Sequence, residues 1–77
     1  MIIPDEFLKL DSWEITALLS LQITEGLHRA IQFFKFKTGE EMSVKGAEWI
    51  LNQEAHTLVT SLSDLREEIY EQLCKQR

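Results

Sequence analysis

The chain has 77 residues, of which 13 are acidic and eight are basic, and its formal net charge is −5 at pH 7. This length suits one domain, which we predict to span residues 1–77, and the negative charge disfavours nucleic acid because phosphates carry the same sign. The single cysteine, Cys74, excludes an intrachain disulfide. A small secreted domain usually needs several disulfides, so we expect the protein in the reducing cytoplasm.

The N-terminal residues predict a short turn and no membrane segment. The apolar start, Met1–Ile3, is interrupted by Pro4 and two acidic residues, so neither a signal-peptide core nor a membrane-spanning run is expected. Residues 4–10 are predicted to make one turn, in which Phe7 and Leu8 fold back onto the rest of the chain.

Residues 11–39 carry the signals of a long first helix. Asp11 and Glu14 have the spacing of a capping box, in which each side chain accepts a hydrogen bond from the other residue's amide. No proline intervenes before Gly39, which supplies the left-handed residue that ends many helices. These signals predict one helix over about residues 12–37.

This predicted helix has a wide apolar face. At about 100° per residue its apolar positions cover an arc of about 160°, which exceeds the roughly 100° stripe of an ordinary surface helix. The arc consists of Ile15, Leu19, Ile23, Gly26, Leu27, Ala30, Ile31, Phe33 and Phe34. Gly26 and Ala30 leave a shallow strip where another backbone can approach closely. We therefore predict that a second copy of the chain covers this face.

The end of the first predicted helix admits an alternative structure. Alternation of phenylalanine and lysine over residues 34–37 also suits a strand, so residues 34–44 could form a short β-hairpin. An isolated two-stranded hairpin is marginal in water, and Phe33 and Phe34 continue the arc of the helix. The helix end is the favoured interpretation.

A second long helix is predicted over about residues 43–75, capped by Ser43. Its apolar residues recur at spacings of four and three, as in a helix that packs lengthwise on others: Leu51, Ala55, Leu58, Leu62, Leu65 and Ile69. With Ile23, Gly26 and Ala30 they form the predicted core and dimer seam. The polar residues around Ser63 could cap a separate helix, but the seam keeps its phase there and favours one helix.

A second stripe lies beside this seam and mixes aromatic with polar residues. It consists of Trp49, Asn52, His56, Val59, Ser63, Arg66 and Tyr70. Trp, Tyr and Arg dominate partner-binding hot spots, because each buries a large area and keeps a hydrogen-bonding group. We predict a protein-binding surface here. The alternative is that the stripe is the polar rim of the core.

Two patterns resemble metal sites. Glu25 and His28 have the Glu-x-x-His spacing of di-metal bundles, and with His56 they define a metal-binding alternative. On the predicted helix, however, both residues lie away from the apolar arc. The acidic residues Glu67, Glu68 and Glu71 face away from the leucine seam, as solvated side chains do. We therefore expect no catalytic residue, metal or cofactor.

An RNA-binding bundle is the remaining alternative. Its basic residues lie close to phenylalanines: Arg29, Lys35, Lys37 and Lys45. Glu40 and Glu41 offset half of this positive charge, which weakens the case for a nucleic-acid surface.

These observations predict an all-α fold, a long helical hairpin that dimerises into a four-helix bundle. The predicted function is that of a small acidic, non-enzymatic protein–protein interaction module. Such a module serves as a regulator, adaptor, inhibitor or chaperone of another protein, and binding is its whole mechanism.

Overall fold

The structure is a computed structural model that describes all residues from Met1 to Arg77. It contains one 3-10 helix and five α-helices: η1 (Asp5–Lys9), α1 (Ser12–Glu25), α2 (Leu27–Thr38), α3 (Val44–Asn52), α4 (Glu54–Val59) and α5 (Leu62–Gln76). No strand is present, so the predicted all-α class is confirmed and the alternative β-hairpin over residues 34–44 is wrong.

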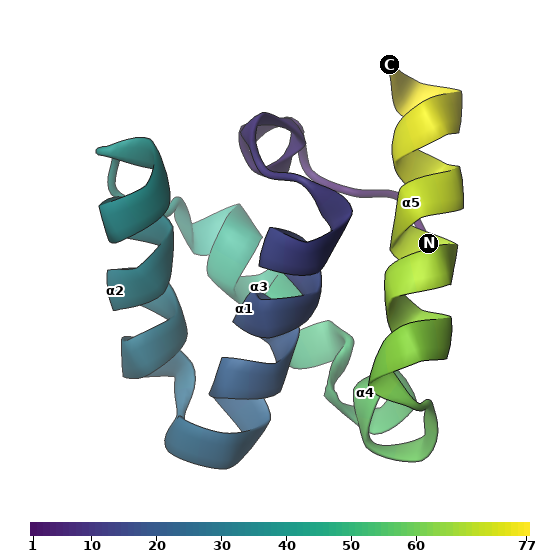
Figure 1. Cartoon of the computed structure of the whole chain (residues 1–77). Helices are drawn as coiled ribbons and strands as arrows, with labels where there is room; N and C mark the ends of the chain where they lie inside the picture. Colours follow the sequence, from purple (N-terminus) through teal and green to yellow (C-terminus); the bar gives the residue numbers. More distant parts are fainter.

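Helix α1 is the centre of the fold and contacts each of the other four α-helices. Figure 1 shows α1 between α2 on the left and α5 on the right, with α3 behind it and α4 leading from α3 into α5. Both α2 and α5 run in the direction opposite to α1. The side of α1 that carries Trp13 and Ala17 remains at least partly exposed.

The predicted helix over residues 12–37 is wrong, because it is divided at Gly26. This glycine has φ 105° and ψ 164°, a backbone conformation that residues with a side chain rarely adopt. Its N–H donates to the carbonyls of Leu21 and Gln22 and closes α1, after which α2 returns beside α1 (Figure 1). The two halves of the predicted helix thus form a hairpin.

This hairpin explains the wide apolar arc. Ile15 and Leu19 of α1 are buried, as are Ala30 and Phe34 of α2, and all four belong to one core cluster. The arc that seemed to need a second copy of the chain is therefore covered to a large extent from within the chain.

The predicted helix ends are confirmed where a side chain or glycine sets them. Glu14 N–H donates to Asp11 Oδ1 at 2.8 Å and Asp11 N–H donates to Glu14 Oε1 at 2.9 Å, which completes the capping box of α1. Gly39, with φ 74°, ends α2 in the left-handed conformation. The hydroxyl of Ser43 accepts from Gly46 N–H and caps α3.

The predicted helix over residues 43–75 is also wrong, since it is divided into α3, α4 and α5. The Thr60 hydroxyl donates to the His56 carbonyl at 2.7 Å, and Thr60 itself has an extended backbone. Ser61 then accepts from Asp64 N–H and caps α5. Such polar side chains compete with helical hydrogen bonds, so the chain stops and restarts here.

The division of this helix also divides the predicted leucine seam. Leu65 and Ile69 of α5 are buried in the core, whereas Leu51, Leu58 and Leu62 are exposed. A continuous seam along one helix is therefore wrong, because its residues lie on three separate helices and only Leu65 and Ile69 of these leucines and isoleucines reach the core.

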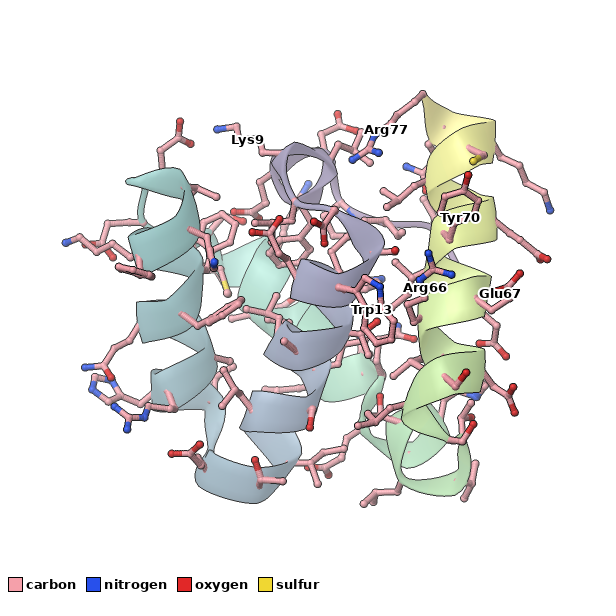
Figure 2. The ribbon with its side chains drawn as sticks, in the orientation of Figure 1. Lys9, Trp13, Arg66, Glu67, Tyr70 and Arg77 are labelled. Atoms are coloured by element: carbon pink, nitrogen blue, oxygen red, sulfur yellow. The ribbon has the colours of Figure 1, made fainter.

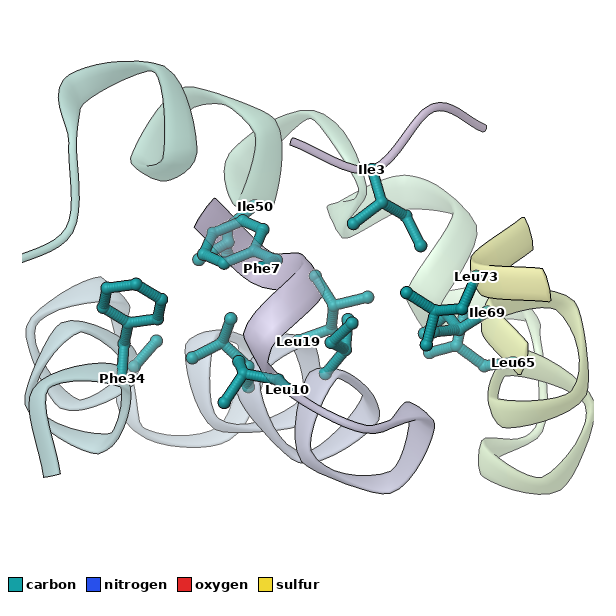
Figure 3. Close-up of a cluster of buried hydrophobic side chains, with 12 residues drawn as sticks. Ile3, Phe7, Leu10, Leu19, Phe34, Ile50, Leu65, Ile69 and Leu73 are labelled. Carbon is teal, nitrogen blue, oxygen red and sulfur yellow. The ribbon is translucent and has the colours of Figure 1, made fainter. Parts of the chain in front are cut away.

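The N-terminal segment packs against the helices, as predicted for Phe7. The ring of Phe7 is fully buried and lies 5.4 Å from the ring of Phe34 and 5.5 Å from that of Trp49. Ile3 exchanges two hydrogen bonds with the Gln76 side chain, which fixes the first residues to α5. Figure 3 shows this core cluster, to which η1, α1, α2, α3 and α5 all contribute.

Candidate functional site

Two exposed aromatic residues contact an arginine where α1 meets α5. The Arg66 guanidinium carbon is 5.3 Å from the centre of the Trp13 ring and 5.1 Å from that of the Tyr70 ring. Trp13 is 59% exposed and Tyr70 is 49% exposed. Figure 2 shows Arg66 reaching from α5 toward Trp13 on α1, with Tyr70 above it. Cation–π contacts at exposed sites contribute about 0.5 to 1 kcal/mol each and favour this arrangement of the three side chains.

An uncharged hollow of about 300 Å³ adjoins this group and is called the α1–α5 groove below. Its lining residues are Trp13, Thr16, Ala17, Ser20, Leu21 and Leu62. The polar groups among them are two hydroxyls and the Trp13 indole N–H, and the Thr16 hydroxyl already donates to the Ser12 carbonyl. The groove is thus apolar, and most of its surface comes from α1.

Helical periodicity explains why these residues remain on the surface. Ile15, Leu18 and Leu19 turn one side of α1 into the core. Trp13 and Ala17, four residues apart, lie on the other side. On α5, the buried residues Leu65, Ile69 and Leu73 leave Leu62, Arg66 and Tyr70 on the flank nearest α1.

Arg66 has unused hydrogen-bonding capacity. Its Nη1 donates to Glu67 Oε2 at 3.4 Å, and its buried Nε has no partner. A guanidinium has five N–H donors, so most of them make no hydrogen bond within the chain. Arg66 does not itself line the groove, but its guanidinium lies against Trp13, which does.

The structure brings together only part of the predicted partner-binding stripe. Arg66 and Tyr70 are in contact, but Trp49 is half-buried and packs against Phe7 in the core. The core-rim alternative thus describes Trp49. A single stripe along one helix is wrong, because its residues are distributed over three helices.

The other stripe residues lie on α3 and α4. Asn52 is exposed, and Val59, at the end of α4, is 83% exposed. The Nε2 atom of His56 is 2.6 Å from Glu68 Oε2, which links α4 to α5. None of these three residues lines the α1–α5 groove.

Trp13 is the functional candidate that sequence reasoning missed. A signal was present, since Trp13 lies outside the apolar arc of the predicted helix and a large aromatic residue outside the core face indicates a contact surface. Its neighbour Arg66 is 53 positions away, and nothing in the sequence pairs α1 with α5.

The residues of the predicted metal alternative are distributed around the fold. Glu25 and His28 are exposed on either side of the turn at Gly26, and Glu25 Oε1 accepts from Arg29 Nε at 3.2 Å. His56 is held by Glu68 on α5. No group of three or more His, Cys, Asp or Glu side chains is placed to hold a metal ion.

Three of the basic residues considered for RNA binding form ion pairs with carboxylates: Arg29 with Glu25 at 3.2 Å, Lys35 with Glu41 at 2.6 Å, and Lys37 with Glu14 at 3.7 Å. The hydrogen bond and the negative charge of Glu41 raise the pKa of Lys35 above its ordinary value. The positive charge at this end of the molecule is thus largely compensated.

An acidic surface lies on the side of α5 that faces away from the core. Its residues surround a hollow of about 470 Å³: Val59, Thr60, Ser61, Asp64, Glu67, Glu68 and Glu71. Glu68 is paired with His56 and Glu67 with Arg66, whereas Asp64 and Glu71 form no ion pair. The surface therefore keeps uncompensated negative charge.

Comparison with known proteins yields no relative from which a function can be transferred. No family model matches the chain, and neither a curated protein nor a solved structure is similar to it. Each helix is too short or too polar to cross a membrane.

Proposed function

We propose that the protein is a non-enzymatic interaction module that binds another protein through the α1–α5 groove. The observation that carries this proposal is the exposed Trp13–Arg66–Tyr70 group beside an uncharged hollow. Tryptophan, tyrosine and arginine are enriched at the few positions that supply most of the binding energy in protein interfaces. Because the cation–π contacts favour this arrangement before binding, less side-chain freedom is lost when a partner arrives.

The size and lining of the groove favour a protein side chain over a small molecule. A hollow of about 300 Å³ is at the lower limit for small-molecule sites, which span roughly 300 to 1,000 Å³. Small-molecule sites also need several polar groups to orient the ligand, and here the lining offers only two hydroxyls and the Trp13 indole N–H, with the Thr16 hydroxyl already bonded to Ser12. Leu62 and Leu21 offer instead a surface for an apolar side chain. Binding alone is the proposed mechanism, as in a regulator, adaptor, inhibitor or chaperone.

Truncating Trp13 tests this proposal. Trp13→Ala is expected to weaken the affinity for the partner by about 2 kcal/mol, about thirtyfold, with little change in melting temperature because the ring is exposed. The protein retained by wild-type bait from cells of the source organism is identified by mass spectrometry and purified, and its affinity for each variant is measured.

Phe36→Ala is the matched control, since Phe36 is also an exposed aromatic residue but lies on α2. The control is expected to bind like the wild type. Equal affinity of Trp13→Ala and wild type, with both folded, would contradict the proposal.

A homodimer is a second proposal, supported by three residues of the predicted seam that remain exposed and by Val59. The stretch from α3 to the start of α5 exposes four large apolar side chains that a second copy of the chain would cover: Leu51, Leu58, Val59 and Leu62. Such a dimer differs from the predicted bundle of two long hairpins, because both long helices are divided.

Light scattering tests the dimer. A mass near twice the chain's 9.0 kDa is expected at micromolar concentrations, and Leu58→Asp is expected to restore the monomer because it places a charge in the contact. A mass of one chain at every concentration would exclude the dimer and would leave the groove proposal unaffected.

A further inference from the structure

The Trp13–Arg66–Tyr70 group offers hydrogen-bond donors to a ligand. The guanidinium of Arg66 makes one hydrogen bond within the chain, from Nη1 to Glu67 Oε2 at 3.4 Å. The indole N–H of Trp13 and the hydroxyl of Tyr70 are further donors, and both side chains are exposed. No carboxylate lines the adjoining α1–α5 groove. A ligand that binds here therefore needs hydrogen-bond acceptors.

The positive charge of Arg66 is only weakly compensated. Its ion-pair partner Glu67 is the next residue on α5, and the Glu67 side chain is 62% exposed. Exposed ion pairs contribute little to stability, so the carboxylate of a ligand can replace Glu67 at small cost. The Arg66 side chain is only 30% exposed, so much of its hydration is already lost before a partner binds.

Trp13 connects this cation to the apolar groove. Its ring lines the groove and also contacts the guanidinium of Arg66. Ala17, Leu21 and Leu62 supply the apolar remainder of the lining. A ligand that uses both the groove and the guanidinium must therefore carry an apolar group and an acceptor close together. Side chains three or four positions apart on a helix satisfy this requirement, because their Cβ atoms are about 5 to 6 Å apart.

The other carboxylates of α5 belong to a different surface. Asp64, Glu68 and Glu71 line the acidic hollow, which shares no lining residue with the α1–α5 groove. Glu67 also lines that hollow and projects from α5 on the side away from α1 (Figure 2). These carboxylates and the net charge of −5 repel a doubly charged phosphate group more strongly than a carboxylate. A carboxylate is therefore the favoured acceptor.

We propose that the α1–α5 groove takes a large apolar side chain of the partner protein while an aspartate or glutamate within four positions of that side chain pairs with Arg66. This inference rests on the proposed function and specifies the partner's chemistry. A carboxylate suits the guanidinium because both groups are planar and can be joined by two parallel hydrogen bonds. A lysine or arginine at the same place would be repelled by Arg66.

A peptide library tests the proposal without the natural partner. Random peptides of about 12 residues, roughly three turns if helical, are displayed on phage and selected on the full-length protein. The library is first depleted on the Trp13→Ala variant, so that the peptides retained by the wild type depend on the groove. These peptides are expected to combine a large apolar residue with an aspartate or glutamate within four positions.

Paired substitutions then locate the carboxylate. One selected peptide is synthesised with its acidic residue and again with the corresponding amide, and fluorescence anisotropy measures both affinities. The acidic peptide is expected to bind the wild-type protein at least about fivefold more tightly than the amide peptide. On Arg66→Gln this difference is expected to fall below about twofold, because the group that pairs with the carboxylate has been removed.

Two further variants serve as controls. Arg66→Lys keeps the positive charge without the planar guanidinium, so it is expected to keep only part of the difference, and it carries the comparison if Arg66→Gln does not fold. Arg29→Gln removes an exposed arginine of α2 that pairs with Glu25, and it is expected to leave the full difference. Circular dichroism and thermal melting confirm that each variant is folded.

The results separate the partner's chemistry from the site itself. Enrichment of lysine or arginine in the selected peptides, or equal binding of the acidic and amide peptides, would overturn the acidic partner. A preference for the acidic peptide that persists in Arg66→Gln would place the carboxylate elsewhere and overturn the inference. A selection without any groove-dependent peptide would also overturn it, whereas the proposed function is judged separately by Trp13→Ala and the captured protein.

Discussion

Phe7→Ala is expected to lower the free energy of unfolding by about 3 to 5 kcal/mol, the range for removing a buried phenylalanine ring. The ring of Phe7 is fully buried and contacts Phe34 of α2 and Trp49 of α3, so its loss leaves a cavity where three elements meet. A chain of 77 residues has a total stability of roughly 4 to 12 kcal/mol. At the lower end of this range the variant is close to unfolding at room temperature.

Urea unfolding followed by circular dichroism measures this loss. Phe36→Ala is the control, because Phe36 is 81% exposed and its truncation is expected to change stability by no more than about 0.5 kcal/mol. Similar losses for the two variants would mean that the N-terminal segment does not pack into the core.

Gly26→Ala is expected to destabilise the protein by about 1 to 3 kcal/mol, the usual cost of a residue held in a disfavoured backbone conformation. A Cβ atom at this position would meet no other atom within 4 Å, so the cost arises from the φ of 105° alone. The sign of the effect distinguishes two folds. In an unbroken helix over residues 12–37 the same change would stabilise the protein by about 1 kcal/mol.

Thermal unfolding of Gly26→Ala and of Gly39→Asn measures this sign. Gly39 has φ 74° and ψ 5°, a left-handed conformation that asparagine tolerates, so the second variant is expected to lose less stability. An increase in the melting temperature of Gly26→Ala would favour the unbroken helix and contradict the hairpin of α1 and α2.

Local signals in the sequence predicted the helix ends, but not the breaks within the long helices. The capping box at Asp11, the left-handed Gly39 and the cap at Ser43 each depend on residues within four positions, and the structure contains all three. Gly26 was placed inside a helix because apolar residues continue in phase on both sides of it. That phase is kept because both arms of the hairpin bury their apolar faces in the same core.

The break between α4 and α5 had a signal in the sequence, but the periodicity of the leucines favoured an unbroken helix. Ser61 and Asp64 have the spacing of a cap, and they form one. The leucine spacing across this point favoured an unbroken helix, yet Leu58 and Leu62 on either side of the break are exposed and Leu65 is buried. A regular spacing does not show which of its members face the core of the molecule.

The candidate site was harder to predict from the sequence than the helices were, because it depends on contacts between distant residues. Arg66 and Tyr70 were identified from their residue types and their spacing on one helix. Trp13 completes the site only because α5 packs beside α1, and this pairing is set by contacts between residues more than 50 positions apart. Trp49 was assigned to the same surface, and the fold turns it toward Phe7 instead.

The central claim is that a partner binds at the α1–α5 groove, and chemical-shift mapping by NMR tests it most directly. The nitrogen-labelled protein is titrated with the purified partner captured by the wild-type chain, and the two indole N–H signals are followed together with the backbone amides. The Trp13 indole and the amides of Ala17, Leu62 and Tyr70 are expected to shift, while the Trp49 indole stays unchanged. Shifts at Trp49, His56 and Val59 with Trp13 unaffected would contradict the groove as the binding site.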